Sequence, residues 1–315
     1  MKNYKLSQWV LTAGETHVSL GCVDFSQLLF GLFDGDLTQP IHFYGLDSAV
    51  VSIVRCKILY QMILNQVMSR SILQVWFSSG WSNSTLKDFI DACNQLMKSK
   101  ELLENESNLV KYWLSNDVPL KKATDEWFKG IGGVVAPYEP CANFKNEIDR
   151  VDYARYLFTG YIFEEEEKNL SSGNRTMFAI PLNLEVTKTA GENFFHFFDT
   201  PSNTNFEYKD SLKLSVDNFV IGKIEMLKDL VSKEKLVMTF EQGFVSRKNS
   251  ELIAKIKILN AYTIDWSNIP DYLTKEDFLE IAKGGLISFF FFFDLAQISN
   301  KKCQITPLSI FCLGR

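Results

Sequence analysis

The sequence has few of the residues that metal sites and disulfide frameworks require. It contains only three histidines, and its cysteines form no Cys-x-x-Cys pair, so the ligand spacing of a zinc site is excluded. Scattered thiols and an N-terminus too polar for a secretory signal indicate a reducing, cytoplasmic compartment. The six cysteines are Cys22, Cys56, Cys93, Cys141, Cys303 and Cys312.

Long hydrophobic runs and an excess of basic residues are also missing. Nowhere do 18 apolar residues follow one another, so we expect no membrane-spanning helix. The net charge of −5 comes without a concentrated basic face, which argues against nucleic acid as a partner. No Gly-x-Ser-x-Gly motif and no Cys–His arrangement supports nucleophilic hydrolysis. Two of the dispersed histidines, His17 and His42, lie inside apolar runs and are expected in the core.

What the chain does contain is typical of a globular protein. Its 315 residues can bury a substantial core, and 46% of them are hydrophobic against 23% charged. Phenylalanine is over-used, at 26 residues, so we expect a core rich in aromatic side chains.

Two short apolar runs near the start each end in a turn that carries Gly and Asp. We predict strands at residues 16–20 and 41–46, joined by a helix at residues 25–33. Ser48 is a suitable N-cap for a long helix at residues 49–67. This strand–helix–strand unit predicts an α/β fold with a crevice at the strand ends.

Beyond the first 70 residues the alternation of strands and helices stops. Residues 72–77 fit either a strand or a buried helix, several helices follow, and residues 170–205 resemble a loop. Sheet-like patterns then return. We predict strands at residues 213–220, 235–240 and 256–264, and helices at residues 221–233, 250–254 and 275–283.

These patterns predict one Rossmann-like domain over residues 1–283, interrupted by a long, mainly helical insertion at about 70–205. Residues 284–315 form an atypical tail in which five phenylalanines follow one another at 289–293. A buried strand is one interpretation of this run. The other is that the tail is not native, because a pyrimidine-rich intron end translates as poly-Phe.

The predicted crevice offers three candidate ligand contacts. Gly21 follows the first strand, Asp24 lies in the next turn, and Asp47 follows the second strand, 26 positions after Gly21. The full Gly-x-Gly-x-x-Gly pattern is absent, which disfavours a dinucleotide and suits S-adenosylmethionine better, because that ligand carries no phosphate. The alternative is structural: Gly21 serves a tight turn, Asp24 caps a helix, and Asp47 bonds its own turn.

Later strands contribute further candidates. For an S-adenosylmethionine site, Glu241 would lie near the adenine, and Asp265 or Asn268 near the group that accepts the methyl. No acid–base pair and no metal site stands out, so we assign no catalytic residue.

Four short segments resemble a known family. Residues 19–24 look like the Leu-Gly-Cys-Gly-Asp opening of a domain of unknown function shared by dynein axonemal assembly factor three and MYND-finger proteins. Residues 155–160 resemble that family's Arg-…-Thr-Gly element, and residues 187–192 its Lys-Thr-Ala-Gly-Glu segment. Residues 266–272 are similar to a Ser-Asn-…-Asp-Tyr segment of the MYND-finger branch.

The resemblance implies a methyltransferase-like Rossmann core and a role in the cytoplasmic preassembly of axonemal dynein arms. It implies dynein chains and chaperones as partners, and no cofactor is expected. Two departures matter: Val23 replaces the second glycine of the opening motif, and the Cys/His array of a MYND finger is absent. We therefore expect a non-catalytic interaction factor, with an S-adenosylmethionine-dependent methyltransferase as the alternative.

Overall fold

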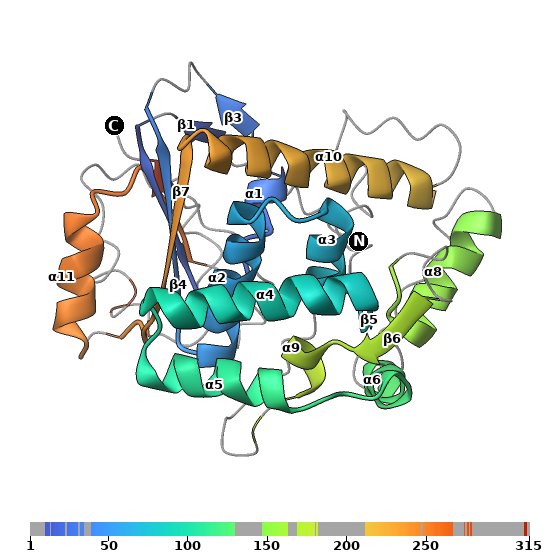
Figure 1. Cartoon of the computed structure of the whole chain (residues 1–315). Helices are drawn as coiled ribbons and strands as arrows, with labels where there is room; N and C mark the ends of the chain where they lie inside the picture. Colours follow the sequence, from blue (N-terminus) through green and yellow to red (C-terminus); the bar gives the residue numbers. More distant parts are fainter. Residues whose placement is uncertain are drawn as a thin grey trace. The chain divides into compact units, whose positions relative to one another are not determined.

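In the computed structural model the chain divides into two compact units. Figure 1 labels helices and strands of both. The sheet unit comprises residues 6–53 and 230–315, and the helical unit comprises residues 1–5 and 54–229. The prediction of one domain with an insertion stays a prediction. The structure describes residues 10–12, 14–22, 24–30, 32–34, 39–129, 147–162, 169–179, 181, 212–246, 248–266, 274, 276, 278 and 312–313.

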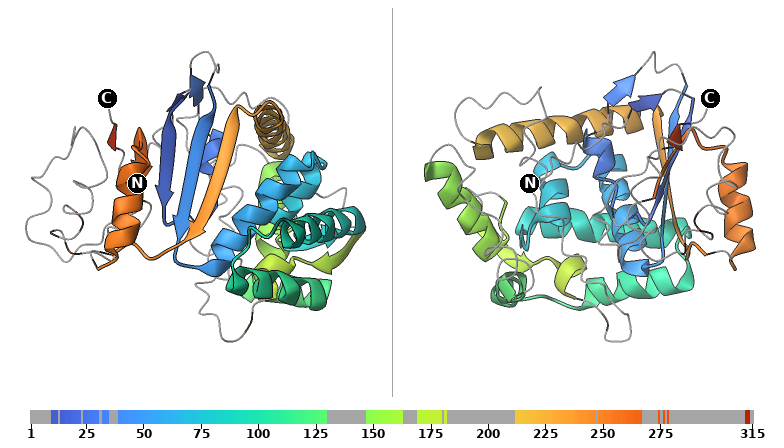
Figure 2. Two further views of the ribbon diagram at one scale, coloured as in Figure 1. Left: turned by 60° about the vertical axis from the view of Figure 1, so that its left-hand side comes forward. Right: turned by 180° about the vertical axis from the view of Figure 1, so that it is seen from behind.

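The sheet unit is built on parallel strands that lie side by side (Figure 2). Their spatial order is β7-β4-β2-β8, and β9 pairs antiparallel with β8 at the end of the sheet. In chain order the four parallel strands are thus the third, second, first and fourth, which is compatible with a Rossmann-like fold. The strands are β2 (Thr16–Leu20), β4 (Ile41–Asp47), β7 (Leu236–Gln242), β8 (Thr263–Asp265) and β9 (Cys312–Leu313).

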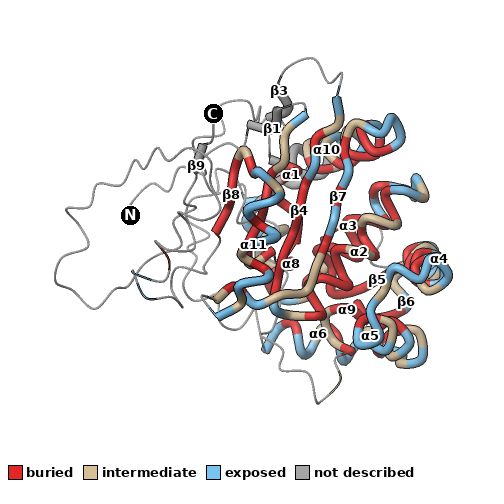
Figure 3. Tube along the Cα trace, turned by 90° about the vertical axis from the view of Figure 1, so that its left-hand side faces the viewer, coloured by how far each residue is buried: buried red, intermediate tan, exposed pale blue. Residues whose placement is uncertain are grey.

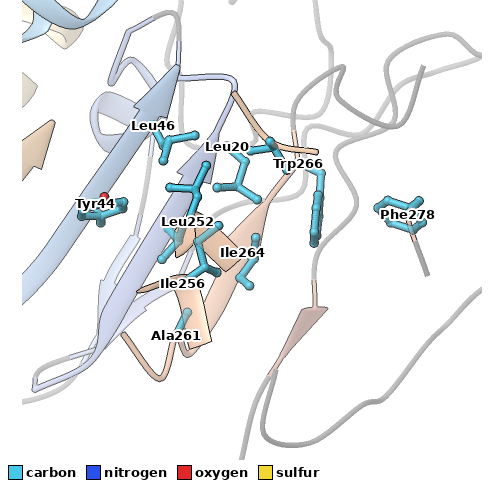
Figure 4. Packing of buried hydrophobic residues seen from close by; sticks show 11 residues of the cluster. Leu20, Tyr44, Leu46, Leu252, Ile256, Ala261, Ile264, Trp266 and Phe278 are labelled. Atoms are coloured by element: carbon cyan, nitrogen blue, oxygen red, sulfur yellow. The ribbon is translucent and has the colours of Figure 1, made fainter. Parts of the chain in front are cut away.

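Alternating side chains give the sheet one face that packs on α11 (Ser250–Ile258). Leu252 and Ile256 of this helix are buried against apolar side chains of β2, β4 and β8 (Figure 4). The short helix α1 (Gln27–Phe30) follows β2, and a separate parallel pair is formed by β1 (Val10–Thr12) and β3 (Leu32–Asp34).

The helical unit contains most of the helices and one small antiparallel pair of strands. Two helices are shared between the units, because α2 begins and α10 ends in the sheet unit. The elements are α2 (Val50–Leu64), α3 (Ser69–Phe77), β5 (Gly80–Ser82), α4 (Asn83–Ser99), α5 (Glu104–Ser115), α6 (Leu120–Trp127), α8 (Glu147–Thr159), β6 (Leu170–Gly173), α9 (Arg175–Phe178) and α10 (Leu212–Ser232).

The core of the helical unit is aromatic, as the composition predicts, and one polar residue connects its elements. Trp76, Trp81, Trp113 and Trp127 are all buried. Asn174 is also fully buried, and its side-chain amide donates to the backbone oxygens of Val75, in the last turn of α3, and of Ser78, just after that helix. This side chain thereby satisfies carbonyls that the end of α3 leaves without helical partners.

One predicted strand is wrong. Residues 213–220 belong to α10, which runs as a single helix from Leu212 to Ser232. Val220, Ile224, Leu227 and Val231 are buried at spacings of four, three and four residues, which is helical periodicity. The wrong prediction arose because the apolar and polar residues at the start of this helix alternate with the two-residue period of a strand.

Several other boundaries also differ from the prediction. The helix expected at residues 25–33 covers only Gln27–Phe30, and residues 72–77 are helical rather than extended. Residues 256–258 complete α11, which Asn260 ends in a left-handed conformation, so β8 begins only at Thr263. The loop predicted at residues 170–205 starts with β6 and α9. Residues 180 and 182–205 lie outside the described residues, as do most of residues 275–283 and of the tail.

Candidate functional site

The carboxyl ends of β2, β4 and β8 meet at one edge of the sheet, where the predicted contacts lie. Gly21 turns the chain there with a φ of 73°, a conformation that glycine adopts without strain. The backbone N–H groups of Gly21 and Cys22 both donate to the Leu46 carbonyl, at 2.8 and 2.9 Å. The turn therefore closes onto β4, and its two amides are already engaged.

Asp24 and Asp47 each bond a backbone amide two residues further along the chain. Oδ1 of Asp24 accepts from the Ser26 N–H at 2.8 Å, and Oδ1 of Asp47 accepts from the Ala49 N–H at 2.7 Å. Both side chains are nearly buried. These bonds order the turns that lead into α1 and α2, as the structural alternative expects.

Burial disfavours the charged form of the Asp47 carboxyl. Desolvation raises the pKa of this carboxyl above its ordinary value, and the bond from the Ala49 amide offsets only part of the shift. A buried acid of this kind at a strand end either costs stability or serves a ligand.

Asp265 ends β8 and lies directly beside Ser19 of β2 in the sheet register. Both residues are buried, with 3% of Asp265 and none of Ser19 exposed. The Ser19 hydroxyl has no hydrogen-bond partner, which is unusual for a buried polar group. Ser19, Asp47 and Asp265 share one sheet face by the alternation of side chains, so the fold brings these three together.

Glu241 lies on the opposite face of the sheet, because it is in register with Leu46 of the α11-facing core. Its carboxylate accepts a hydrogen bond from the Tyr44 hydroxyl and pairs with Lys255 of α11. Burial, the bond to Glu241 and the charge of Glu241 all raise the pKa of Tyr44. Glu241 thus holds α11 to the sheet, and the fold does not bring it together with Asp47 and Asp265.

Sequence reasoning missed two small residues that shape this edge. Gly45 lies beside Ser19, and a Cβ added there would approach Cys22 Sγ to 2.7 Å and the Phe240 ring to 2.8 Å. The available signal was a Ser and a Gly near the ends of two adjacent apolar strands. Small side chains at such positions indicate that another group lies close to the backbone.

The two histidines expected in the core behave differently. His17 is fully buried, and its Nδ1 lies 2.7 Å from the Thr263 hydroxyl, so it is a satisfied core residue. His42 is exposed, which contradicts the expectation for it, because its side chain lies on a part of the sheet that α11 does not cover. Val23 and Asn268 lie outside the described residues.

One of the resembling segments has a structural role. Gly160 ends α8 with a φ of 72°, and its N–H donates to the Tyr156 carbonyl at 2.7 Å. A Cβ at this position would approach Trp127 and Ser79 within 2.7 Å. The segment at residues 187–192 lies outside the described residues, as does that at 266–272 apart from Trp266.

The described residues contain no candidate metal site, because no three of their His, Cys, Asp or Glu side chains are grouped to hold an ion. In those same residues, no helix combines the length and the apolar character needed to cross a membrane. Among known proteins, no family model, no curated protein and no solved structure matches this chain.

Proposed function

We propose that this chain is a non-catalytic protein-interaction factor on a Rossmann-like frame. The observation that carries the proposal is the closed turn after β2, where the amides of Gly21 and Cys22 bond the Leu46 carbonyl. In ligand-binding Rossmann folds this first turn offers its backbone to the ligand. Here the turn is already hydrogen-bonded within the protein, and so are the carboxylates of Asp24 and Asp47. This favours a Rossmann-like fold that no longer binds a ligand over a functional ligand site.

We further propose that the frame is methyltransferase-like and that residues 70–205 are an insertion. The 3-2-1-4 order of the parallel strands supports this, because it matches the first four strands of the doubly wound order 3-2-1-4-5-6. The chain between β4 and β7 takes the place of a simple crossover helix, and its described part is mainly helical.

The cellular role follows from the resemblance to the dynein axonemal assembly factors: cytoplasmic preassembly of dynein arms, with dynein chains and chaperones as partners. Disruption of the gene in a ciliated cell should leave axonemes without dynein arms in electron micrographs. Re-expression of the Asp47→Ala variant, provided that it accumulates normally, should restore the arms as well as the parent chain does. Normal dynein arms after disruption of the gene would contradict the proposal.

A second candidate, an S-adenosylmethionine-dependent methyltransferase, is favoured by the unpartnered Ser19 hydroxyl beside Asp265. Calorimetry with S-adenosylhomocysteine separates the two. Micromolar binding that is lost in Asp47→Ala but kept in Asp91→Ala, which changes an exposed acid of α4, would favour the methyltransferase. We expect no heat of binding from the parent protein.

A further inference from the structure

The segment before α11 carries two basic residues that precede a serine. It reads Arg247-Lys248-Asn249-Ser250, so the two cations stand three and two positions before the hydroxyl. No other arginine of the chain stands three positions before a serine or a threonine. One class of protein kinases selects its substrates by this charge pattern, because carboxylates of the kinase pair with the cations. The sequence therefore indicates Ser250 as a target for the transfer of a phosphoryl group.

The structure places Ser250 where a kinase can reach it. This residue is exposed and is the first residue of α11. β7 ends at Gln242, and the described residues between the two elements, 243–246, 248 and 249, belong to no helix or strand. A kinase binds the residues around its target in an extended form, so only the first turn of α11 has to open. The rest of α11 can stay packed on the sheet, against which its buried residues lie (Figure 3).

Thr124 shows how the structure separates an accessible target from a similar pattern. Lys121 and Lys122 stand three and two positions before it. However, Thr124 lies inside α6, and its hydroxyl donates to a carbonyl of the preceding turn at 3.0 Å. Each of the two lysines pairs with the acid four residues further along the same helix. The hydroxyl and both cations of this second pattern are thus engaged within the helix, whereas Ser250 is exposed at a helix start.

A phosphate on Ser250 would act on the start of α11. Phosphoserine carries nearly two negative charges at pH 7, and the free amides at the start of a helix favour negative charge. Asn249 accepts from the Leu252 amide, whereas the helix itself offers no acceptor to the amides of Ser250 and Glu251. The charges of α11 already follow this preference, with an acid in the first turn and lysines in the last. The phosphate should therefore stabilise the helix that covers this face of the sheet.

We propose that Ser250 is phosphorylated by a protein kinase that selects basic residues before its target, and that the phosphate stabilises the first turn of α11. The Ser250 Oγ forms a bond to the γ-phosphorus of ATP, and the bond from this phosphorus to the β,γ-bridging oxygen breaks. ADP leaves, and the hydroxyl proton passes to a carboxylate of the kinase. Glu251 follows the serine directly, so the kinase recognises the preceding cations rather than an apolar residue after the target. This modification goes beyond the proposed function and does not depend on it.

Phosphorylation of the full-length chain tests the site. The purified chain is incubated with ATP, Mg²⁺ and a cytosolic extract of ciliated cells, and its phosphopeptides are quantified by mass spectrometry. We expect most of the phosphate on Ser250, its loss in Ser250→Ala, and its retention in Thr124→Ala.

The role of the basic residues is tested in the same assay. Arg247→Ala should slow the phosphorylation of Ser250 by about tenfold, because it removes a cation that the kinase pairs with. Lys257→Ala, which removes an exposed lysine of α11 outside the pattern, should leave the rate unchanged. Phosphate only on other residues, no phosphate at all, or an unchanged rate in Arg247→Ala would overturn the proposal.

Hydrogen exchange tests the effect of the phosphate on α11. In the phosphorylated chain, amides at the start of this helix should exchange about threefold more slowly than in the unmodified chain, and added salt should reduce the difference. Ser250→Asp, which places one negative charge at the same position, should act in the same direction but more weakly. A peptide from α4 is the control and should exchange equally in all samples. Unchanged or faster exchange at the start of α11 would overturn the proposed stabilisation.

Discussion

Small and polar side chains at the carboxyl ends of β2 and β4 set the limits of what this sheet edge can do. Asp24 and Asp47 order their own turns, whereas the Ser19 hydroxyl, equally buried, has no partner. Because Gly45 has no side chain, Cys22 Sγ and the Phe240 ring lie in the space that a Cβ there would fill. Packing has therefore filled the place beside the turn where a ligand group would approach the backbone.

The first residue-scale prediction concerns Gly45→Ala. The new methyl group would overlap Cys22 Sγ and the Phe240 ring, so we expect a loss of about 1–3 kcal/mol in the free energy of unfolding, measured in urea. Gly222→Ala is the matched control. A Cβ there meets no atom within 4 Å and lies inside α10, so it should stabilise by up to about 1 kcal/mol. Equal stability of the two variants would refute the close approach at Gly45.

The second prediction is a pH dependence from Asp47. Burial raises the pKa of this carboxyl in the folded protein, so its contribution is most favourable below the unfolded value of about 3.9. It becomes less favourable as the pH rises through the raised pKa. Asp47→Asn should therefore unfold at higher urea than the parent at pH 7, with the difference shrinking toward pH 4.

The control for this titration is Asp91→Asn, which changes an exposed acid and should leave the pH profile unaltered. A variant Asp47→Asn that is less stable than the parent at pH 7 would show that the carboxylate is needed for the fold in its charged form.

At the scale of elements, buried polar side chains hold both ends of α5 in the helical unit. The carboxylate of Glu106 is fully buried at the start of α5, where it accepts from the Leu103 amide at 2.9 Å. The same group receives both hydrogen bonds of Lys57 from α2, at 2.7 and 2.8 Å. Arg175 similarly caps the other end of α5 by donating to the Trp113 and Leu114 carbonyls.

The element-scale prediction is that Glu106→Ala destabilises the chain by about 2–4 kcal/mol. It removes the cap of α5 and leaves Lys57 without its partner in a largely buried place. The exposed pair of Lys121 and Asp125 on α6 is the comparison, and Asp125→Asn should leave the urea midpoint unchanged. Equal effects of the two substitutions would contradict the importance of burial.

At the scale of the whole molecule, the sheet and helical units are joined by continuous helices. α2 begins in the sheet unit and continues into the helical unit, and α10 runs the other way. A helix that crosses a boundary cannot unfold on one side without losing hydrogen bonds and packing on the other.

We therefore predict a single cooperative unfolding transition. Hydrogen exchange followed by mass spectrometry across a urea series should show peptides from β4 and from α4 losing protection at the same denaturant concentration. Separate midpoints for the two peptides would mean that the shared helices do not couple the units.

Local patterns predicted the elements whose period is unambiguous. The strands at the start of the chain and the helix after Ser48 were found because their apolar residues repeat cleanly. The start of α10 was mistaken for a strand, because a short apolar-polar alternation fits both periods until its burial is known. The sequence located the polar residues at the strand ends, but it did not show on which face of the sheet each side chain lies. Glu241 was therefore grouped with Asp47 and Asp265, although it lies on the opposite face.

The sequence by itself determined the α/β class, the parallel strands and the polar residues at their ends, since these depend on periodicity and on local turn chemistry. Only the tertiary structure decided how these groups are used. The engagement of the Gly21 amide with Leu46, the lone Ser19 hydroxyl and the exposure of His42 all depend on which strands pair and which helix covers them. Such contacts join residues far apart in the chain, and no local pattern encodes them.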